Sequence, residues 1–384
     1  MMPLFRKHPV RVQPFFGYRS RGQLVLSARA LRSRAPMFKS RSRWHSVRTV
    51  LRQFFPGPVP GLAIRMEIRG DGGLLLTREV VTDRGGFARF DCDITPGWDL
   101  PEQPEWEVAS LSWVNADGPQ VAYARILAPG KNSDLAVISD IDDTIIETGI
   151  TGGLGSVIRN WRRIFAQLPH ERLAVPHADL FYGELGGASH PQPKSELRPS
   201  LSLPATRRPF FYVSSSPWNL LNFLVAFQRS KRLPLGPLLL RAWGMNKSTL
   251  GQQSHGTHKT QAIGGILAMY PTLRFALIGD DTQGDLPAFA ELVAAYPGRI
   301  AAVFLRMVSQ QSFSAEEEAA LAAIKLTGVP LWLGDSYEVG LAFLRTLGFT
   351  PGGETEQIVR VVEKVGVGVA EPASGEAEAP APPA

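Results

Sequence analysis

Residues 135–138 form an unbroken apolar run, Leu-Ala-Val-Ile, that stops at a cluster of acids. A short run without alternation is typical of a parallel strand buried on both faces of a sheet. Asp140, Asp142 and Asp143 follow it, and burying acids beside a core strand is costly unless they pair, bind a metal or take part in chemistry. An ordinary acidic turn is the alternative. The close spacing of Asp140 and Asp142, with Thr144 two residues further on, favours a functional site.

From residue 133 onwards, strand-like and helix-like segments alternate, which predicts an α/β fold with a doubly wound parallel sheet, a Rossmann-like arrangement, over 133–365. The expected strands are 135–139, 209–214, 238–240, 275–279, 300–306 and 329–333. The expected helices are 155–167, 217–229, 259–269, 286–295, 315–325 and 337–347.

The preceding segment, 46–130, has a different pattern, with short strand-like runs separated by turns rich in Gly and Asp. This pattern is typical of a small antiparallel β-sandwich, and it contains no catalytic constellation. Pro129-Gly130-Lys131 forms the expected boundary between the two regions.

The N-terminal segment, 1–45, is expected to be an extended basic arm with one strand at 23–28. No Asp or Glu precedes Glu67, and the net charge of the chain is +6. A polycation of this kind favours an anionic partner, such as an acidic membrane surface, nucleic acid or an acidic protein. A solvated arm without a single partner is an equal alternative.

Two other segments have compositions typical of disorder. Residues 184–208 are rich in Gly, Ser, Pro and Arg, which predicts a flexible insertion or a lid, and 371–384 are mostly Ala, Pro, Glu and Gly. No run is long enough to span a bilayer, and the first sixteen residues lack the apolar core of a secretory signal. We therefore expect a cytoplasmic protein that is able to associate peripherally with a membrane.

Chemically useful side chains follow several of the predicted strands. Ser214 ends the second strand, Asp280 follows the fourth, and Asp285 comes five residues later; Lys259 lies at the start of a predicted helix. In a doubly wound sheet these residues and Asp140 converge on one edge. Carboxylates beside an amine and a hydroxyl suit a hard cation, Mg²⁺ above all, together with a phosphate group.

Charge also indicates how such a site would work. A carboxylate nucleophile is repelled by a phosphate ester unless cations neutralise both, and a metal ion on Asp140 and on Asp280 or Asp285, with Lys259, would do so. Attack by Asp140 would form an aspartyl-phosphate. The neighbouring carboxylate, Asp142, would protonate the leaving oxygen and then activate water.

The sequence Asp140-Ile-Asp-Asp-Thr144 resembles the first motif of haloacid dehalogenase-like (HAD-like) phosphatases, Asp-x-Asp-x-Thr. Ser214, Lys259 and the pair Asp280 and Asp285 match the second, third and fourth motifs in the family's order. The resemblance implies that Asp140, Asp142, Asp280 and Asp285 bind metal. It also implies that Asp140, Asp142, Ser214 and Lys259 are catalytic and that Thr144 and Ser215 bind phosphate.

A narrower resemblance involves longer stretches. Residues 211–220, 236–241 and 278–285, with His258-Lys259, are similar to segments of App1-like phosphatidate phosphatases, which also carry a β-rich region before the catalytic domain. This resemblance implies Mg²⁺-dependent conversion of phosphatidate to diacylglycerol, with a phospholipid substrate and no nucleic acid. Asp281 departs from the pattern, because family members usually have a small residue there, and the extra acid is expected to alter the metal geometry.

Some of these residues also have simpler interpretations. Asp285 could cap the helix that follows it, Lys259 could be solvated, and Ser216-Pro217 is typical of a helix N-cap and first helical residue. Two other functions stay open: a HAD-like phosphatase acting on a soluble phosphomonoester, and a non-catalytic protein that binds anionic surfaces.

Overall fold

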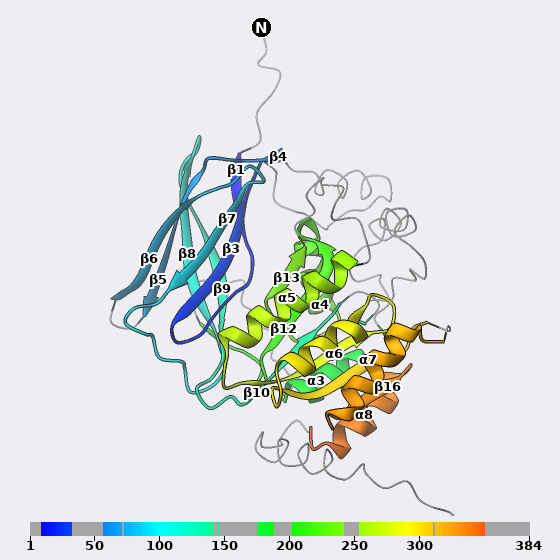
Figure 1. Ribbon diagram of the computed structural model, residues 1–384. Helices are drawn as coiled ribbons and strands as arrows, with labels where there is room; N and C mark the ends of the chain where they lie inside the picture. The colour runs from blue at the N-terminus through cyan, green and yellow to red at the C-terminus, as the bar shows by residue number, and fades with distance from the viewer. Residues whose placement is uncertain are drawn as a thin grey trace, which may run out of the picture.

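The computed structural model describes residues 9–32, 57–70, 73–141, 144–145, 175–187, 202–241, 253–309 and 312–349. They form an α/β structure with two sheets (Figure 1). One is a mixed sheet built mostly from the N-terminal part of the chain, called the β-rich sheet below, and the other is a parallel sheet flanked by helices. The predicted helix 155–167, the middle of the predicted insertion and the tail 371–384 lie outside the described residues. None of the described helices is long and apolar enough to cross a membrane.

The parallel sheet has six strands in the order β13-β12-β10-β14-β15-β16. They are β10 (Leu135–Ser139), β12 (Phe210–Pro217), β13 (Leu238–Arg241), β14 (Arg274–Asp280), β15 (Ile300–Arg306) and β16 (Leu331–Gly334). The strands expected from the sequence are confirmed, with shifts of a few residues at some ends. Because β10 lies between β12 and β14, the carboxyl ends of these three strands are neighbours.

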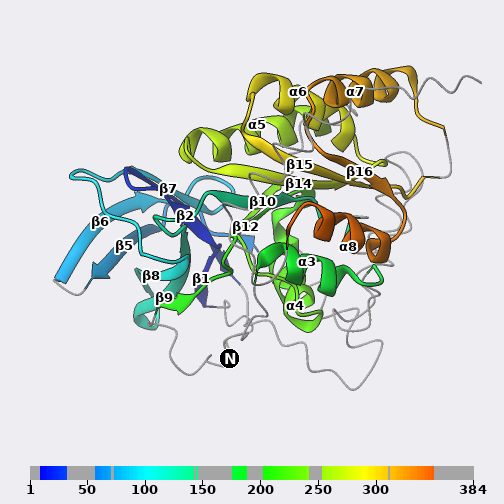
Figure 2. The ribbon, with the colours of Figure 1, turned by 90° about the horizontal axis from the view of Figure 1, so that it is seen from below.

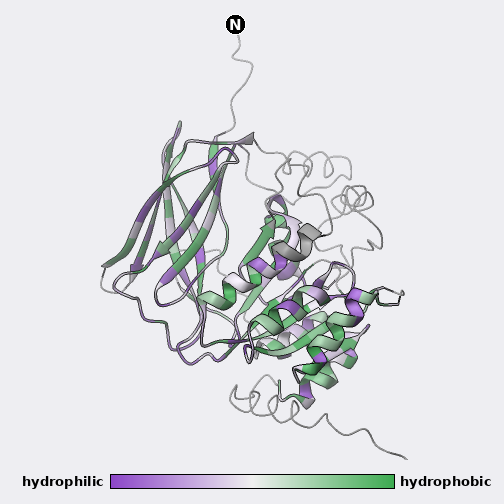
Figure 3. Ribbon diagram, viewed as in Figure 1, coloured by the Kyte–Doolittle hydropathy of each residue, from purple (hydrophilic) through white to green (hydrophobic). Residues whose placement is uncertain are grey.

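Helices pack on both faces of this sheet, and alternate residues of β10 divide between them (Figure 2). Leu135 and Val137 pack with α3 (Ala178–Gly186), α4 (Leu221–Ser230) and α8 (Tyr337–Thr346). Ala136 and Ile138 pack with the helices of the opposite face, which are α5 (Gln253–Met269), α6 (Asp285–Ala295) and α7 (Ala315–Leu326). The strand is apolar on both sides, as its sequence predicts, and the central strands are coloured as hydrophobic in Figure 3.

The other sheet has ten strands within the described part of the chain. They are β1 (Val10–Pro14), β2 (Gly17–Arg19), β3 (Gln23–Arg32), β4 (Gly57–Pro58), β5 (Ala63–Gly70), β6 (Gly73–Val81), β7 (Phe87–Asp93), β8 (Glu105–Asn115), β9 (Gly118–Ala128) and β11 (Leu203–Pro204). Among the described residues, all strand pairs of this sheet are antiparallel except β2 with β9, so this β-rich sheet is mixed. Its arrangement as a sandwich stays a prediction.

The prediction of an extended arm over 1–45 is wrong for residues 10–32, because they form β1, β2 and β3. The strand expected at 23–28 is the first part of β3. Its alternate residues Leu24, Leu26, Ala28 and Ala30 are buried, so the segment has an apolar face despite its basic character.

The predicted insertion, 184–208, is ordered at both ends. Its start belongs to α3, and near its end β11 pairs with β8 of the β-rich sheet. Arg208 is buried, and its Nη1 donates to the carbonyl oxygens of Glu184 and Leu185 at 3.0 and 2.9 Å. The insertion therefore links the two sheets, while residues 188–201 lie outside the described part of the chain.

Phe181, in α3, lies at the centre of an aromatic cluster. This cluster packs α3 and α8 against the same face of the parallel sheet. Phe181 is fully buried and contacts Tyr182, Phe304, Trp332 and Tyr337. We expect Phe181→Ala to lower the free energy of unfolding by about 3–5 kcal/mol, measured by denaturant titration. Leu180→Ala, at a neighbouring side chain that is 54% exposed, is the matched control. Equal losses in the two variants would contradict this.

Candidate active site

Three aspartates meet where β10 and β14 end. Asp140 follows β10, and its N–H donates to the carbonyl oxygen of Ile278 in β14 at 2.9 Å. Asp280 is the last residue of β14, and Asp285 is the first residue of α6. One carboxylate oxygen of each aspartate lies within 4.8 Å of the others, and all three residues are buried. The structure thus brings together the acids that follow two strands in the sequence.

Lys259 places its ammonium group between two of these carboxylates. Its Nζ lies 3.2 Å from Oδ2 of Asp140 and also donates to Oδ1 of Asp285. The side chain is almost fully buried, so it is not the solvated lysine of the simpler interpretation. Helix α5 begins at Gln253, before the predicted start at Lys259. The prediction missed this first part because the polar residues before Lys259 show no apolar periodicity.

Burial and charge oppose each other at these groups. Burial alone would lower the pKa of Lys259, but Asp140, Asp285 and Asp280 raise it above its ordinary value. Burial, followed by the charge of Asp285, raises the pKa of Asp280 to about 7, although Lys259 and Thr282 act in the opposite direction. With all four groups ionised, three carboxylates and one ammonium leave two negative charges. A divalent cation would balance them.

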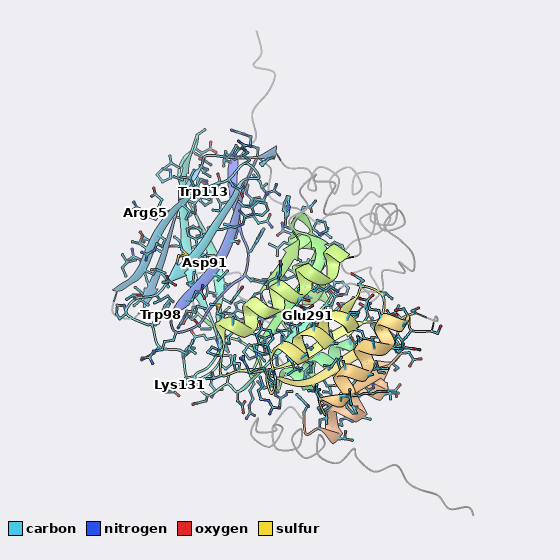
Figure 4. The ribbon with its side chains drawn as sticks, in the orientation of Figure 1. Arg65, Asp91, Trp98, Trp113, Lys131 and Glu291 are labelled. Atoms are coloured by element: carbon cyan, nitrogen blue, oxygen red, sulfur yellow. The ribbon has the colours of Figure 1, made fainter. Side chains whose placement is uncertain are left out.

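The carboxylate of Asp285 is directed toward the site. Its Oδ2 accepts a hydrogen bond from the N–H of Asp280 at 3.1 Å, and its side chain does not cap α6, where Gly284 is the N-cap residue. Glu291, which lies on the same helix and is labelled in Figure 4, instead accepts an exposed hydrogen bond from the hydroxyl of Thr260. The helix therefore presents one acid to the site and one to its outer side.

Gly279 makes this approach of Asp285 possible. A Cβ at position 279 would lie 2.4 Å from Oδ2 of Asp285 and 2.8 Å from its Cγ, which are both too close for a real contact. The sequence analysis did not single out Gly279, although a glycine between an apolar strand and an acid is a visible signal of close backbone approach.

Two threonines bind Asp280. The hydroxyl of Thr144 donates to Oδ2 at 2.9 Å, and Thr282 donates to Oδ1 from its N–H at 2.7 Å and from its hydroxyl. Thr144 was expected to bind phosphate, and in the structure its hydroxyl orients a carboxylate. Thr282 was not identified from the sequence, because its role depends on a local turn after the strand.

Ser214 lies in β12, the strand next to β10, and is fully buried. Its Oγ accepts a hydrogen bond from the N–H of Ser216 at 2.9 Å. The prediction that Ser216 caps a helix at Pro217 is wrong. Strand β12 continues to Pro217, and the following 3₁₀ helix, η2 (Trp218–Leu220), has no side-chain cap. Ser215 is buried beside Ser214.

Asp281 does not belong to the group of three aspartates. Its carboxylate accepts hydrogen bonds from the N–H groups of Val308 and Ser309, at 2.7 and 3.0 Å to Oδ1, and so fixes the loop after β15. The expectation that this extra acid alters the metal geometry is not supported by these contacts. Asp142 lies outside the described residues.

A buried layer of tyrosines supports the backbone under the site. The hydroxyl of Ser139 donates to the carbonyl oxygen of Asp140 at 2.6 Å and lies 2.7 Å from the hydroxyl of Tyr182. The hydroxyl of Tyr337 donates to the carbonyl oxygen of Thr144 at 2.9 Å. Neither tyrosine was identified from the sequence, since both lie far from the motifs along the chain.

The donor set fits a metal ion. Carboxylate oxygens are the preferred ligands of hard divalent cations, and three buried carboxylates converge here. Asp140, Asp280 and Asp285 are therefore the residues that could hold such an ion, with Lys259 as the neighbouring fixed cation.

Comparison with known proteins places this site inside a recognised segment. Residues 135–307 match the family described as phosphatidate phosphatase APP1, catalytic domain. A protein of Saccharomyces cerevisiae named phosphatidate phosphatase APP1 is 29% identical over 175 residues, which make up 46% of this chain and 26% of the yeast protein. The chain thus matches about a quarter of the length of that relative.

Solved structures give weaker likenesses. A β-glucuronidase of Bifidobacterium dentium complexed with coumarin-3-O-glucuronide is 8% identical, with a TM-score of 0.26 over 85% of this chain and 60% of that one. A putative β-galactosidase of Bacteroides fragilis is 11% identical, with a TM-score of 0.23 over 84% and 54%. Neither likeness supports a conclusion about this chain.

The raised pKa of Asp280 predicts how metal binding depends on pH. From about pH 4 to about pH 7 the folded, metal-free protein keeps a proton on Asp280 that the unfolded chain releases, so the corresponding stability is lost as the pH rises. A cation must displace this proton. We therefore expect the increase in melting temperature on adding Mg²⁺ to be larger at about pH 8 than at about pH 6. Asp280→Asn should remove that difference, and an equal increase at both pH values in the unmodified protein would contradict it.

The contact between Gly279 and Asp285 gives a second prediction. Gly279→Ala should push the Asp285 carboxylate out of the group and weaken Mg²⁺ binding about ten-fold or more, measured by calorimetry or by thermal shift. Gly265→Ala, in α5, is the matched control, because a Cβ there meets nothing within 4 Å. Unchanged Mg²⁺ affinity in Gly279→Ala would show that Asp285 does not bind the metal.

Proposed function

We propose, from the premise that residues 135–307 are an App1-like catalytic domain, that this chain is a phosphatase that hydrolyses phosphatidate to diacylglycerol and phosphate. The observation that carries the proposal is the buried group of Asp140, Asp280, Asp285 and Lys259 within the matched segment. Such a group is expensive to bury without a cation and an anionic substrate to balance it.

Asp140, Asp280 and Asp285 would hold Mg²⁺, which would neutralise charge on the phosphoryl group and on the attacking carboxylate. Lys259 contributes a fixed positive charge beside Asp140. Because its own pKa is raised, it stays protonated, and its positive charge lies 3.2 Å from Oδ2 of Asp140.

The reaction would proceed in two displacements. An Oδ atom of Asp140 attacks phosphorus, the bond from phosphorus to the ester oxygen breaks, and Asp142 donates a proton to the departing alcohol. Asp142 then takes a proton from water, and the resulting hydroxide attacks the aspartyl-phosphate to release phosphate and restore Asp140. Ser214 and the N–H of Ser215 would hold phosphoryl oxygens during both steps, and the position of Ser214 on the strand next to β10 supports this role.

The architecture proposed for this enzyme is a HAD-like, doubly wound catalytic domain preceded by a β-sandwich. The strand order from β10 outward in both directions and the helices on both faces of the parallel sheet support the first part.

A lipid substrate also requires access to a membrane. We propose a cytoplasmic enzyme that is peripheral at an anionic membrane surface, to which its basic N-terminal sequence contributes attraction. The basis is the charge pattern alone, since residues 1–66 contain no acid.

The test of this function is phosphate release by the purified protein with and without Mg²⁺, from phosphatidate in mixed micelles and from a soluble aryl phosphate. We expect Mg²⁺-dependent release from phosphatidate, and a loss of at least about a thousand-fold in Asp140→Asn, because the nucleophile is removed. Glu291→Gln, which changes an exposed acid of α6 in the same way, is the control and should retain activity.

Each other outcome favours a different function. Release from the soluble ester alone would keep the chemistry and replace the lipid by a soluble phosphomonoester. No release from either ester, with binding of the folded protein to anionic vesicles, would favour the non-catalytic surface-binding protein.

A further inference from the structure

Three side chains form one row across neighbouring strands of the β-rich sheet. Gln13 of β1 pairs with Arg29 of β3, and Arg29 pairs on its other side with Phe87 of β7. Residues that pair in this way lie side by side on the same face of a sheet. We call Gln13, Arg29 and Phe87 the 13–29–87 row.

All three members of the row contact residues 218–222. This short segment follows β12 of the parallel sheet and includes η2 and the start of α4. The guanidinium carbon of Arg29 lies 3.0 Å from the ring centre of Trp218. The ring of Phe87 meets the same indole edge to face, with the ring centres 5.4 Å apart. Nε2 of Gln13 donates to Oδ1 of Asn222 at 3.1 Å. A single sheet face thus holds both ends of this segment.

Arg29 is the centre of this contact, and it is only 6% exposed. Its Nε donates to the carbonyl oxygen of Gly85 at 2.7 Å, while among the described residues its Nη1 has no hydrogen-bond partner. The faces of Phe87 and Trp218 lie against this guanidinium and offset part of the cost of removing the cation from water. Burial lowers the pKa of Arg29 to about 10, so it remains charged at neutral pH.

The segment held by the row directly follows the strand that carries Ser214. Strand β12 ends at Pro217, and Trp218 is the next residue. The hydrogen bond from the N–H of Ser216 to the Oγ of Ser214 gives this strand end a fixed shape. Earlier in the same strand, Phe211 packs against Tyr18 of β2, with ring centres 5.7 Å apart. Contacts from the β-rich sheet therefore flank Ser214 on both sides along the chain.

We propose that Arg29 and Trp218 are positioning residues, and that the β-rich sheet uses them to fix the strand end that holds the phosphoryl group. This inference rests on the proposed function, because it assigns Ser214 to phosphate binding. It goes further by making the β-rich sheet part of the catalytic unit. The metal site depends less on this contact, since its ligands come from the ends of β10 and β14 and from α6.

The test compares Arg29→Ala and Trp218→Ala with the control Arg89→Ala in the full chain. Arg89 also lies over the ring of Phe87, at 5.0 Å, but its side chain is 57% exposed and pairs with Asp83. Three quantities are measured in each variant: inhibition by inorganic phosphate, the Mg²⁺ concentration that gives half of the activity, and hydrogen–deuterium exchange of residues 210–222. Arg29→Lys is added because it restores the charge without the planar guanidinium.

We expect Arg29→Ala and Trp218→Ala to weaken phosphate inhibition at least about ten-fold and to speed exchange in 210–222, while half-activation by Mg²⁺ stays within about two-fold. The double variant should be no worse than either single variant, because both remove the same contact. Arg29→Lys should recover part of the phosphate affinity, and Arg89→Ala should resemble the unmodified protein.

Four results would overturn the inference. Exchange of 210–222 could be unchanged, it could rise without any loss of phosphate inhibition, Arg89→Ala could cause the same losses, or phosphate and Mg²⁺ responses could fall together as in general destabilisation. Each of these four results would be obtained with variants of a protein whose unmodified form is active. Failure of the proposed function looks different, because the unmodified protein would then release no phosphate, and this inference would fall with it.

Discussion

The burial of three carboxylates around one ammonium group is the constraint on which the catalytic half of this molecule depends. Asp140, Asp280 and Asp285 are removed from water, and Lys259 balances only one of their charges. Burial, together with the charge of Asp285, raises the pKa of Asp280, so this carboxyl keeps a proton at acidic pH and is free to bind a divalent cation only at higher pH. A site with this imbalance is costly as pure structure and useful as chemistry.

The order of strands makes this concentration of charge possible. Neighbouring parallel strands end at one edge of the sheet, so acids that are distant in the sequence meet there, and no long loop is needed to bring them together. Small local features then decide which atoms point inward. Gly279 lets Asp285 approach, two threonines orient Asp280, and the hydroxyl of Ser139 holds the backbone of Asp140.

These features explain why the strands and the acids could be predicted from the sequence, whereas the residues that hold them in place could not. An apolar strand followed by an acid is a local pattern, and its position in a parallel sheet follows from the alternation of strands and helices. Tyr182 and Tyr337 have no such pattern, because their role depends on contacts across the fold. The strands of residues 10–32 were mistaken for an arm because the N-terminal sequence has many basic residues and no acid before Glu67, whereas alternate residues of β3 are apolar and buried. Asp281 was expected to alter the metal geometry, but its carboxylate binds the loop after β15 instead.

Two buried cations, Lys259 and Arg29, are stabilised in different ways. Carboxylates neutralise Lys259, because its ammonium group forms ion pairs with Asp140 and Asp285. Aromatic faces stabilise Arg29 without cancelling its charge, because a π system carries no net charge of its own. The β-rich sheet thus contributes a rigid, still positive group next to the segment that follows Ser214. A sheet that only anchored the protein would not need to bury an arginine at this point, where an apolar side chain would pack at lower cost.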